Sequence, residues 1–285
     1  MRVRQLATLR RLVALASAFV AGGAARTARA QAILVAPTAV VVTDRARAGA
    51  LTLVNTGEHD VEVRLSTAYG YPVTDSAGAM TLRLFDAVQD TMPSAAPWVR
   101  FFPDRLLLAP GQRRTVRLLV TPPAGLRDGE YWSRVVVSAR RAAEPAGADS
   151  APPIVIGFAL EVRSILALFY RHGAVAPRVR LDAVRATPAG DSLVVRARLT
   201  REGTAAFVGS LRAVLRDGRG VPRAEGVLPL GVYYALEPRI TLPTRGLAAG
   251  AYALTLEALS ARADLPPTAL LQTPAERRET AVVLP

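Results

Sequence analysis

The 285-residue sequence contains no cysteine, no lysine and only two histidines. Without cysteine the chain forms no disulfide and has no thiol chemistry, so packed cores alone must stabilise it. His59 and His172 are far apart in the sequence, and no His/Cys cluster has the spacing of a transition-metal site. We expect both histidines at the surface, and we expect no metal and no other cofactor.

Recognisable catalytic motifs are also missing. The sequence has no G-x-S-x-G elbow, no phosphate-binding loop, no dinucleotide fingerprint and no H-E-x-x-H motif. Its carboxylates are scattered over predicted loops and strand faces, so their spacing nominates no acid and base pair. We therefore expect no catalytic residue, no small-molecule substrate and no enzymatic activity.

The first thirty residues have the pattern of an export signal. A basic start is followed by an apolar stretch from Leu12 to about Ala25 and by Ala28-Arg29-Ala30, an A-x-A cleavage site. A retained anchor is the alternative, but the apolar stretch is short and is interrupted by glycines. We predict a signal peptide over residues 1–30 and an exported mature chain with no membrane span, because charges and prolines interrupt every later apolar run.

The formal charge of +13 includes six leader arginines and no leader acid, so the mature chain carries 13 − 6 = +7. Every basic residue is arginine, and the arginines are scattered along strand-like segments. This distribution indicates solvated strand faces, with anionic partners as the lesser alternative. An exported chain is not expected to bind nucleic acid.

Short alternating runs separated by Gly, Pro and Asp turns predict an all-β chain with two immunoglobulin-like β-sandwich domains in tandem, over residues 31–171 and 172–285. The expected strands of the first are Ile33–Val42, Ala50–Asn55, Val61–Tyr71, Trp98–Phe102, Thr115–Val120, Tyr131–Ser138 and one from Ile154 to Tyr170. Those of the second are Arg178–Ala186, Leu193–Thr200, Phe207–Leu215, Val227–Tyr234, Arg239–Leu242, Ala251–Leu259 and Thr280–Leu284.

Two stretches, Thr74–Pro97 and Ala142–Pro153, are poor in β-branched runs and are expected to be loops. The Asp44-Arg45-Ala46-Arg47 run predicts a charged turn between strands rather than an anion site. Strand alternation predicts that one member of Tyr131-Trp132 is buried and the other lies at the surface.

The 17-residue run from Ile154 to Tyr170 is much longer than an ordinary strand. Alternation places five apolar residues on one of its faces: Ile154, Ile156, Phe158, Leu160 and Val162. This face is either the core of its own domain or an edge offered to a partner.

Several pieces of the first domain, in order and spacing, resemble the periplasmic chaperones of the chaperone-usher pilus pathway. They span Ile33 to Arg171 and comprise Pro37-Thr38 with Val40-Val41-Val42, Leu51-Thr52-Leu53-Val54-Asn55, Leu108-Ala109-Pro110-Gly111-Gln112 with Thr115-Val116-Arg117-Leu118, and Leu166-Ala167-Leu168-Phe169-Tyr170-Arg171. The second domain matches the family only in being rich in strands.

The resemblance implies a periplasmic chaperone that lends alternating apolar residues of the last first-domain strand to a strand-incomplete secreted subunit, with an outer-membrane usher as a further partner. By position, the lending residues are Ile156, Phe158, Leu160 and Val162. The family also binds the terminal carboxylate of the subunit with two basic residues. These positions fall on Ala39 and Ala167, so Arg47, Arg163 and Arg171 become the candidates for carboxylate binding.

The leading hypothesis is thus a non-enzymatic, chaperone-like protein that binds secreted pilus or fimbrial-type subunits by strand donation. The alternative is a structural or adhesive Ig-like module of the cell envelope, in which the long strand only joins two domains.

Overall fold

The computed structural model describes residues 33–142 and 160–285. The predicted signal peptide, the donor positions Ile156 and Phe158, and nearly all of the expected loop Ala142–Pro153 lie outside the described residues. The described part is built from strands with two short 3-10 helices, η1 (Ala96–Trp98) and η2 (Pro267–Ala269). The predicted all-β fold class is confirmed.

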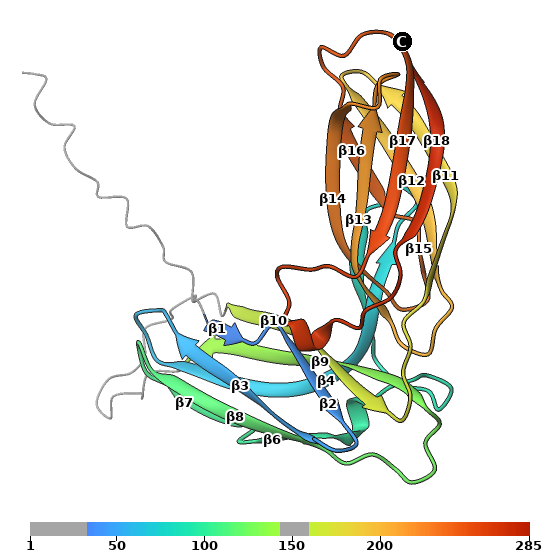
Figure 1. Ribbon diagram of the computed structural model, residues 1–285. Coiled ribbons are helices and arrows are strands. Elements are labelled where there is room, and N and C mark those ends of the chain that lie inside the picture. Colours follow the sequence, from blue (N-terminus) through green and yellow to red (C-terminus); the bar gives the residue numbers. More distant parts are fainter. Residues whose placement is uncertain (1–32, 143–159) are drawn as a thin grey trace, which may run out of the picture. The chain divides into compact units, whose positions relative to one another are not determined.

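The strands up to β10 form two sheets that pack as a sandwich (Figure 1). One sheet has the order β1-β3-β8-β6, and the other has the order β2-β10-β9-β4-β5, with β7 pairing with β4. Their bounds are β1 Ile33–Ala36, β2 Ala39–Thr43, β3 Ala48–Asn55, β4 Val61–Thr74, β5 Met80–Phe85, β6 Val99–Phe102, β7 Arg105–Leu108, β8 Arg113–Val120, β9 Gly129–Arg141 and β10 Glu161–His172.

The strands from β11 onward form a second sandwich (Figure 1). One sheet has the order β11-β12-β15, with β16 also pairing with β12, and the other has the order β14-β13-β17-β18. Their bounds are β11 Val179–Ala189, β12 Ser192–Arg201, β13 Phe207–Arg216, β14 Pro222–Val232, β15 Ala235–Leu236, β16 Arg239–Pro243, β17 Gly250–Leu259 and β18 Glu276–Leu284.

Each sandwich has its own apolar core, as strand alternation predicts. Leu51, Leu53 and Leu168 are among the buried residues of the first core, and Leu193, Phe207 and Leu254 are among those of the second. Burial of such side chains contributes roughly 1.5–3 kcal/mol each, so the two cores supply the stability that disulfides cannot.

A third apolar cluster joins the two sandwiches. Its buried members are Ala39, Tyr69, Trp132, Phe169, Ala206, Val208, Tyr233 and Ala269, which come from both sandwiches and from η2. The described residues accordingly belong to one compact unit.

The joining cluster covers one member of the Tyr131-Trp132 pair. Trp132 is 1% exposed in it, as expected for the buried member. Tyr131 on the opposite face is partly buried against the first core, and its hydroxyl donates to the Arg127 carbonyl at an exposed position.

Two expectations are corrected. The predicted strand Ile33–Val42 is two strands: β1 pairs with β3 in one sheet and β2 pairs with β10 in the other, with Pro37 between them. Proline lacks the N–H that a continuous ladder requires. The expected loop Thr74–Pro97 contains β5, which pairs with the far half of β4 after a turn in which Asp75 Oδ1 accepts a hydrogen bond from the Ala79 N–H (2.8 Å).

Candidate functional site

Strand β10 has an edge that is only partly paired. It pairs with β9 along its whole length, from Glu161 to His172, but with β2 only from Ala167 to Arg171. Among the described residues no strand pairs with the other edge of Glu161–Leu166. A strand edge of this kind presents backbone N–H and C=O groups that another chain can pair with.

The side chains at this edge divide between two faces. Leu160 is 60% exposed and Val162 is partly buried. Along β10 their face continues into Leu166, Leu168 and Tyr170 of the first core. Leu160 and Val162 therefore lie where the core face of β10 emerges from its own sandwich, while the same face from Leu166 onward is core.

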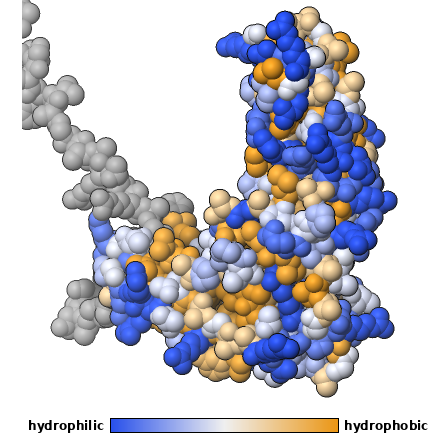
Figure 2. Space-filling model, in the orientation of Figure 1, coloured by the Kyte–Doolittle hydropathy of each residue, from blue (hydrophilic) through white to orange (hydrophobic). Residues whose placement is uncertain are grey.

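The opposite face of the same segment lines a hollow of about 1020 Å³ on the six-stranded sheet. Ile165 is 38% exposed in it, and Arg163 donates a hydrogen bond to Glu161 (2.8 Å). This hydrogen bond holds the pKa of the Glu161 carboxyl below its ordinary value. Figure 2 shows larger apolar areas on the visible face of the first sandwich than on that of the second, which is mostly hydrophilic.

The three arginines proposed for carboxylate binding do not form one group. Arg163 and Arg171 are eight residues apart on one strand, about 26 Å at roughly 3.3 Å per residue. Arg171 is 11% exposed, and its guanidinium donates to Glu130 Oε2 (2.9 Å) and to the carbonyls of Thr268 and Ala269. Arg47 is exposed beside Asp44 in the turn between β2 and β3. One carboxylate cannot contact both Arg163 and Arg171.

The two positions that the resemblance assigns to basic anchors lie side by side. Ala39 and Ala167 are register partners across β2 and β10, and both belong to the joining cluster. Helix η2 lies against β2, and the Thr38 hydroxyl donates to the Asp264 carbonyl in the segment that leads into it (2.8 Å). Residues of the second sandwich therefore pack around the alanine pair.

A basic residue that sequence reasoning missed lies on the neighbouring strand. Arg134 of β9 is the register partner of Ala167 and is 7% exposed. Its Nε donates to the Gly70 carbonyl (2.9 Å), and its guanidinium lies 4.9 Å from the ring centroid of Tyr233. Its Nη2 has no hydrogen-bond partner among the described residues. A lone charge within the apolar strand Trp132–Val137 was the available sequence signal.

The end of β10 is held by the predicted charged turn. The Asp44 carboxylate accepts hydrogen bonds from the Tyr170 hydroxyl and the Gly173 N–H, and it contacts His172 Nδ1 at 2.7 Å. These hydrogen bonds, chiefly that from Tyr170, hold the pKa of Asp44 far below its ordinary value. Burial, with the Asp44 hydrogen bond, raises the pKa of Tyr170 to about 12. The turn thus fixes the residues that lead into the second sandwich.

Over residues 33–142 and 160–285, no group of three or more His, Asp or Glu side chains is placed to hold a metal ion. Within the same ranges, no helix has the length and apolar character needed to cross a membrane.

Solved structures similar to the chain are chaperones. The YadV chaperone is 15% identical with a TM-score of 0.43, and the match covers 88% of this chain and 99% of that one. A structure of Salmonella enterica SafA pilin in complex with the SafB chaperone matches at 14% identity and a TM-score of 0.38. This match covers 89% of this chain and 97% of that one. The CsuC-CsuE chaperone-tip adhesion subunit complex from Acinetobacter baumannii matches at 14% identity and a TM-score of 0.38. This match covers 73% of this chain and 90% of that one.

No protein-family model and no curated protein matches the chain. The three matches have identities of 15% or less and TM-scores of 0.43 or less. At these identities the likeness concerns the fold.

Proposed function

We propose that the mature chain is a non-enzymatic periplasmic chaperone that binds secreted pilus or fimbrial-type subunits by donating strand β10. The observation that carries this proposal is the edge of Glu161–Leu166, to which no described strand pairs. A subunit that lacks one strand exposes a complementary edge and an apolar groove. Backbone hydrogen bonds then give affinity, and side chains of alternate residues fill the groove.

Leu160 and Val162 are the described donor residues in this proposal, and Ile156 and Phe158 are the expected donors that precede them. Leu160 is 60% exposed, so placing it in a groove would remove apolar surface from water at roughly 25 cal/mol per Å². The chain therefore offers an incomplete subunit both backbone groups and apolar side chains.

The proposal includes export by the signal peptide over residues 1–30 and the division into domains at residues 31–171 and 172–285. An outer-membrane usher is a further expected partner.

Arg47, Arg163 and Arg171 are three alternative candidates for binding the terminal carboxylate of a subunit, each acting without the others. Of these, exposed Arg47 and Arg163 have guanidiniums nearer to solvent than Arg171 does.

The experiment expresses the full chain together with a secreted subunit encoded beside its gene and measures co-purification from the periplasm. Leu160→Asp with Val162→Asp should abolish capture, because a carboxylate entering an apolar groove costs several kcal/mol. Val227→Asp with Val283→Asp is the matched control, since these residues are 57% and 69% exposed on the second sandwich. Circular dichroism confirms that all variants are folded.

Amide hydrogen exchange provides the second measurement. Bound subunit should protect the amides of Glu161–Leu166 and leave those of β18 unchanged. Capture that survives in the folded Leu160 and Val162 variant, without protection of this edge, would support the structural or adhesive module instead.

A further inference from the structure

Three arginines form a row across the outer face of the second sandwich. Arg196 of β12 is the register partner of Arg185 on β11 and of Arg239 on β16. Residues directly opposite each other in antiparallel strands share one face, with Cβ atoms roughly 4.5–5.5 Å apart. The Cβ atoms of the three arginines therefore lie within a span of about 10 Å.

A bulge in β11 brings Arg185 into this row. Between the pairs Asp182↔Arg198 and Arg185↔Arg196, β11 contains one more residue than β12. Ala183 within this bulge has φ +48°, a conformation that alanine rarely adopts. In a regular ladder Val184 would lie opposite Arg196 and Arg185 would point to the other face. The bulge instead packs Val184 against the core and places Arg185 beside Arg196.

The carboxylates around the row are engaged elsewhere. Asp182 and Glu202 pair with Arg180 (3.3 and 3.2 Å), and Glu237 pairs with Arg198 (3.7 Å). Asp75 accepts the Ala79 N–H in the turn between β4 and β5. Within residues 33–142 and 160–285, no carboxylate lies within ion-pair distance of Arg185, Arg196 or Arg239.

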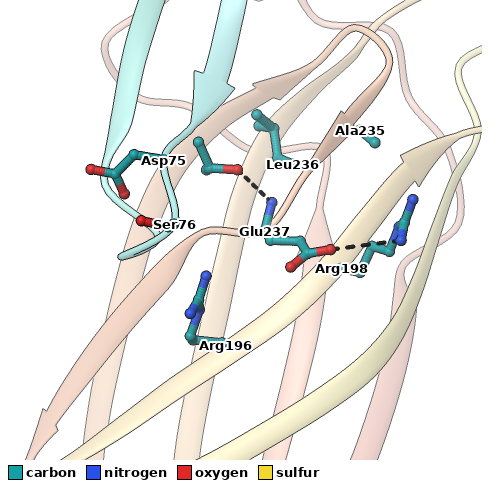
Figure 3. A pocket seen from close by; sticks show the side chains of 8 residues that line it. Asp75, Ser76, Arg196, Arg198, Ala235, Leu236 and Glu237 are labelled. Carbon is teal, nitrogen blue, oxygen red and sulfur yellow. Dashed lines mark hydrogen bonds and ion pairs between the residues drawn. The ribbon is translucent and has the colours of Figure 1, made fainter.

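Arg196 also lines a recess of about 350 Å³ beside the row. Figure 3 shows Glu237 directed toward Arg198, while Arg196 lies apart from that ion pair. The recess is further lined by Thr74, Asp75, Ser76, Ala235 and Leu236. Arg198 and Glu237 complete the lining as an ion pair, so the recess provides space for a small group beside Arg196, which has no ion-pair partner among the described residues.

We propose that the row Arg185–Arg196–Arg239 binds a phosphate group. Like charges directly opposite each other in a sheet destabilise it, and a bound anion would remove that repulsion. The planar guanidinium donates two parallel hydrogen bonds to phosphate, so neighbouring arginines can hold one group from two sides. A free phosphate ester and a phospholipid head group carry this same chemistry. The site is separate from the strand edge of the proposed chaperone function.

The test compares two triple variants of the full chain that change the net charge equally. Arg185→Gln, Arg196→Gln and Arg239→Gln remove the row. Arg113→Gln, Arg114→Gln and Arg117→Gln, all exposed on β8, are the matched control. Thermal unfolding is measured against inorganic phosphate at fixed ionic strength, which keeps general screening constant. Co-sedimentation with phosphatidylcholine vesicles, with and without phosphatidylglycerol, tests the lipid source.

Phosphate should raise the Tm of wild type and control, and the row variant should require at least tenfold more phosphate for the same shift. Without phosphate, the row variant should unfold at or above the wild-type Tm because the arginine repulsion is gone. Sedimentation only with phosphatidylglycerol, lost in the row variant alone, identifies a lipid head group. A phosphate response without sedimentation identifies a free ester. Equal responses of the two triple variants, or no response to either probe, overturn the proposal.

If the row variant does not fold, Arg196→Gln alone is used, because it removes the central guanidinium and leaves two arginines that are not neighbours. Subunit capture should remain at the wild-type level in either row variant. Failure of the phosphate site is thereby distinguished from failure of the chaperone function.

Discussion

Ala39 and Ala167 lie directly opposite each other where the parallel strands β2 and β10 pair. The chaperone resemblance assigns a basic anchor to each of these positions, so the structure brings the two assigned positions to one place. Their methyl groups offer no hydrogen bond to a carboxylate. In the proposed function, affinity for a subunit therefore comes from the free edge of β10 and its apolar side chains.

Restoring a basic residue at this place should destabilise the protein. Ala39 is 2% exposed within the joining cluster, so Ala39→Lys should cost at least about 2 kcal/mol through overpacking and burial of an unpaired charge. Urea unfolding measures the change. Ala50→Lys on β3 is the control because Ala50 is exposed in a strand of the same sandwich. Equal stabilities of the two variants would mean that the joining cluster has room for a basic side chain at position 39.

The strands were the part of the fold that sequence could predict. Alternation between buried and exposed positions depends only on neighbouring residues, and Phe207–Leu215 and Ala251–Leu259 were correctly expected as strands. β5 was missed because its residues, from Met80 to Phe85, are half-buried or exposed and few are β-branched. A strand that pairs at the periphery of a sheet carries little hydrophobic pattern.

The candidate site was harder to predict because it depends on contacts between distant residues. Sequence reasoning nominated Leu160 and Val162 as donor residues. That β10 has no β2 partner before Ala167 follows only from the register of the sheet. Arg171 looked available, whereas Glu130 binds it from a strand 41 residues earlier. No pattern within one strand shows such a contact.

Replacing Glu130 by Gln should weaken the junction between the sandwiches. Its carboxylate is 1% exposed and accepts hydrogen bonds from Trp132 Nε1 (2.9 Å), the Ala206 N–H (3.1 Å) and Arg171 Nε (2.9 Å). Glutamine leaves the Arg171 charge without its partner, and loss of one member of a buried ion pair costs about 3 kcal/mol. Denaturant unfolding followed by tryptophan fluorescence measures this loss.

The control for Glu130→Gln is Glu225→Gln, which breaks an exposed ion pair with Arg212 on the second sandwich. Exposed pairs contribute little, so this variant should unfold like wild type. If the two variants unfold alike, the Glu130 hydrogen bonds do not hold the sandwiches together.

Acid should destabilise the protein partly through Asp44. Its pKa is lower in the folded chain than in the unfolded chain, so its stabilising contribution is complete above its ordinary value of about 4 and is lost as the pH falls below it. Asp44 is partly solvent-exposed, which limits the effect to about 1 kcal/mol or less. Between pH 5 and pH 3, Asp44→Asn should lose less stability than wild type.

Thermal unfolding across that pH range checks the Asp44 prediction. Asp191→Asn is the control because its side chain is 66% exposed and pairs with Arg245 on a different loop. The prediction fails if the stability of Asp44→Asn falls with pH as steeply as that of wild type.

The tip of the β4–β5 hairpin contains Gly78, and the turn between β7 and β8 contains Gly111. Comparing alanine at these two positions separates the cost of backbone strain from the cost of a steric contact. Gly78 has φ +81° and Gly111 has φ +72°, so alanine at either position costs about 1 kcal/mol of backbone strain. A Cβ at Gly78 would lie 2.8 Å from Arg239 Cβ and 3.1 Å from the Glu237 carbonyl, whereas a Cβ at Gly111 would meet nothing within 4 Å. Gly78→Ala should therefore cost about 1–3 kcal/mol more than Gly111→Ala.

The site of that extra loss should be the hairpin tip. The Arg239 N–H donates to the Gly78 carbonyl (2.9 Å) and the Glu237 N–H donates to Thr74 Oγ1 (2.9 Å), so displacing the tip exposes both amides. Hydrogen exchange at Arg239 and Glu237 should accelerate in Gly78→Ala and stay unchanged in Gly111→Ala. Equal exchange in the two variants would contradict this prediction. It would show that the added Cβ is accommodated by small local shifts and that the hairpin tip keeps its hydrogen bonds to Arg239 and Glu237.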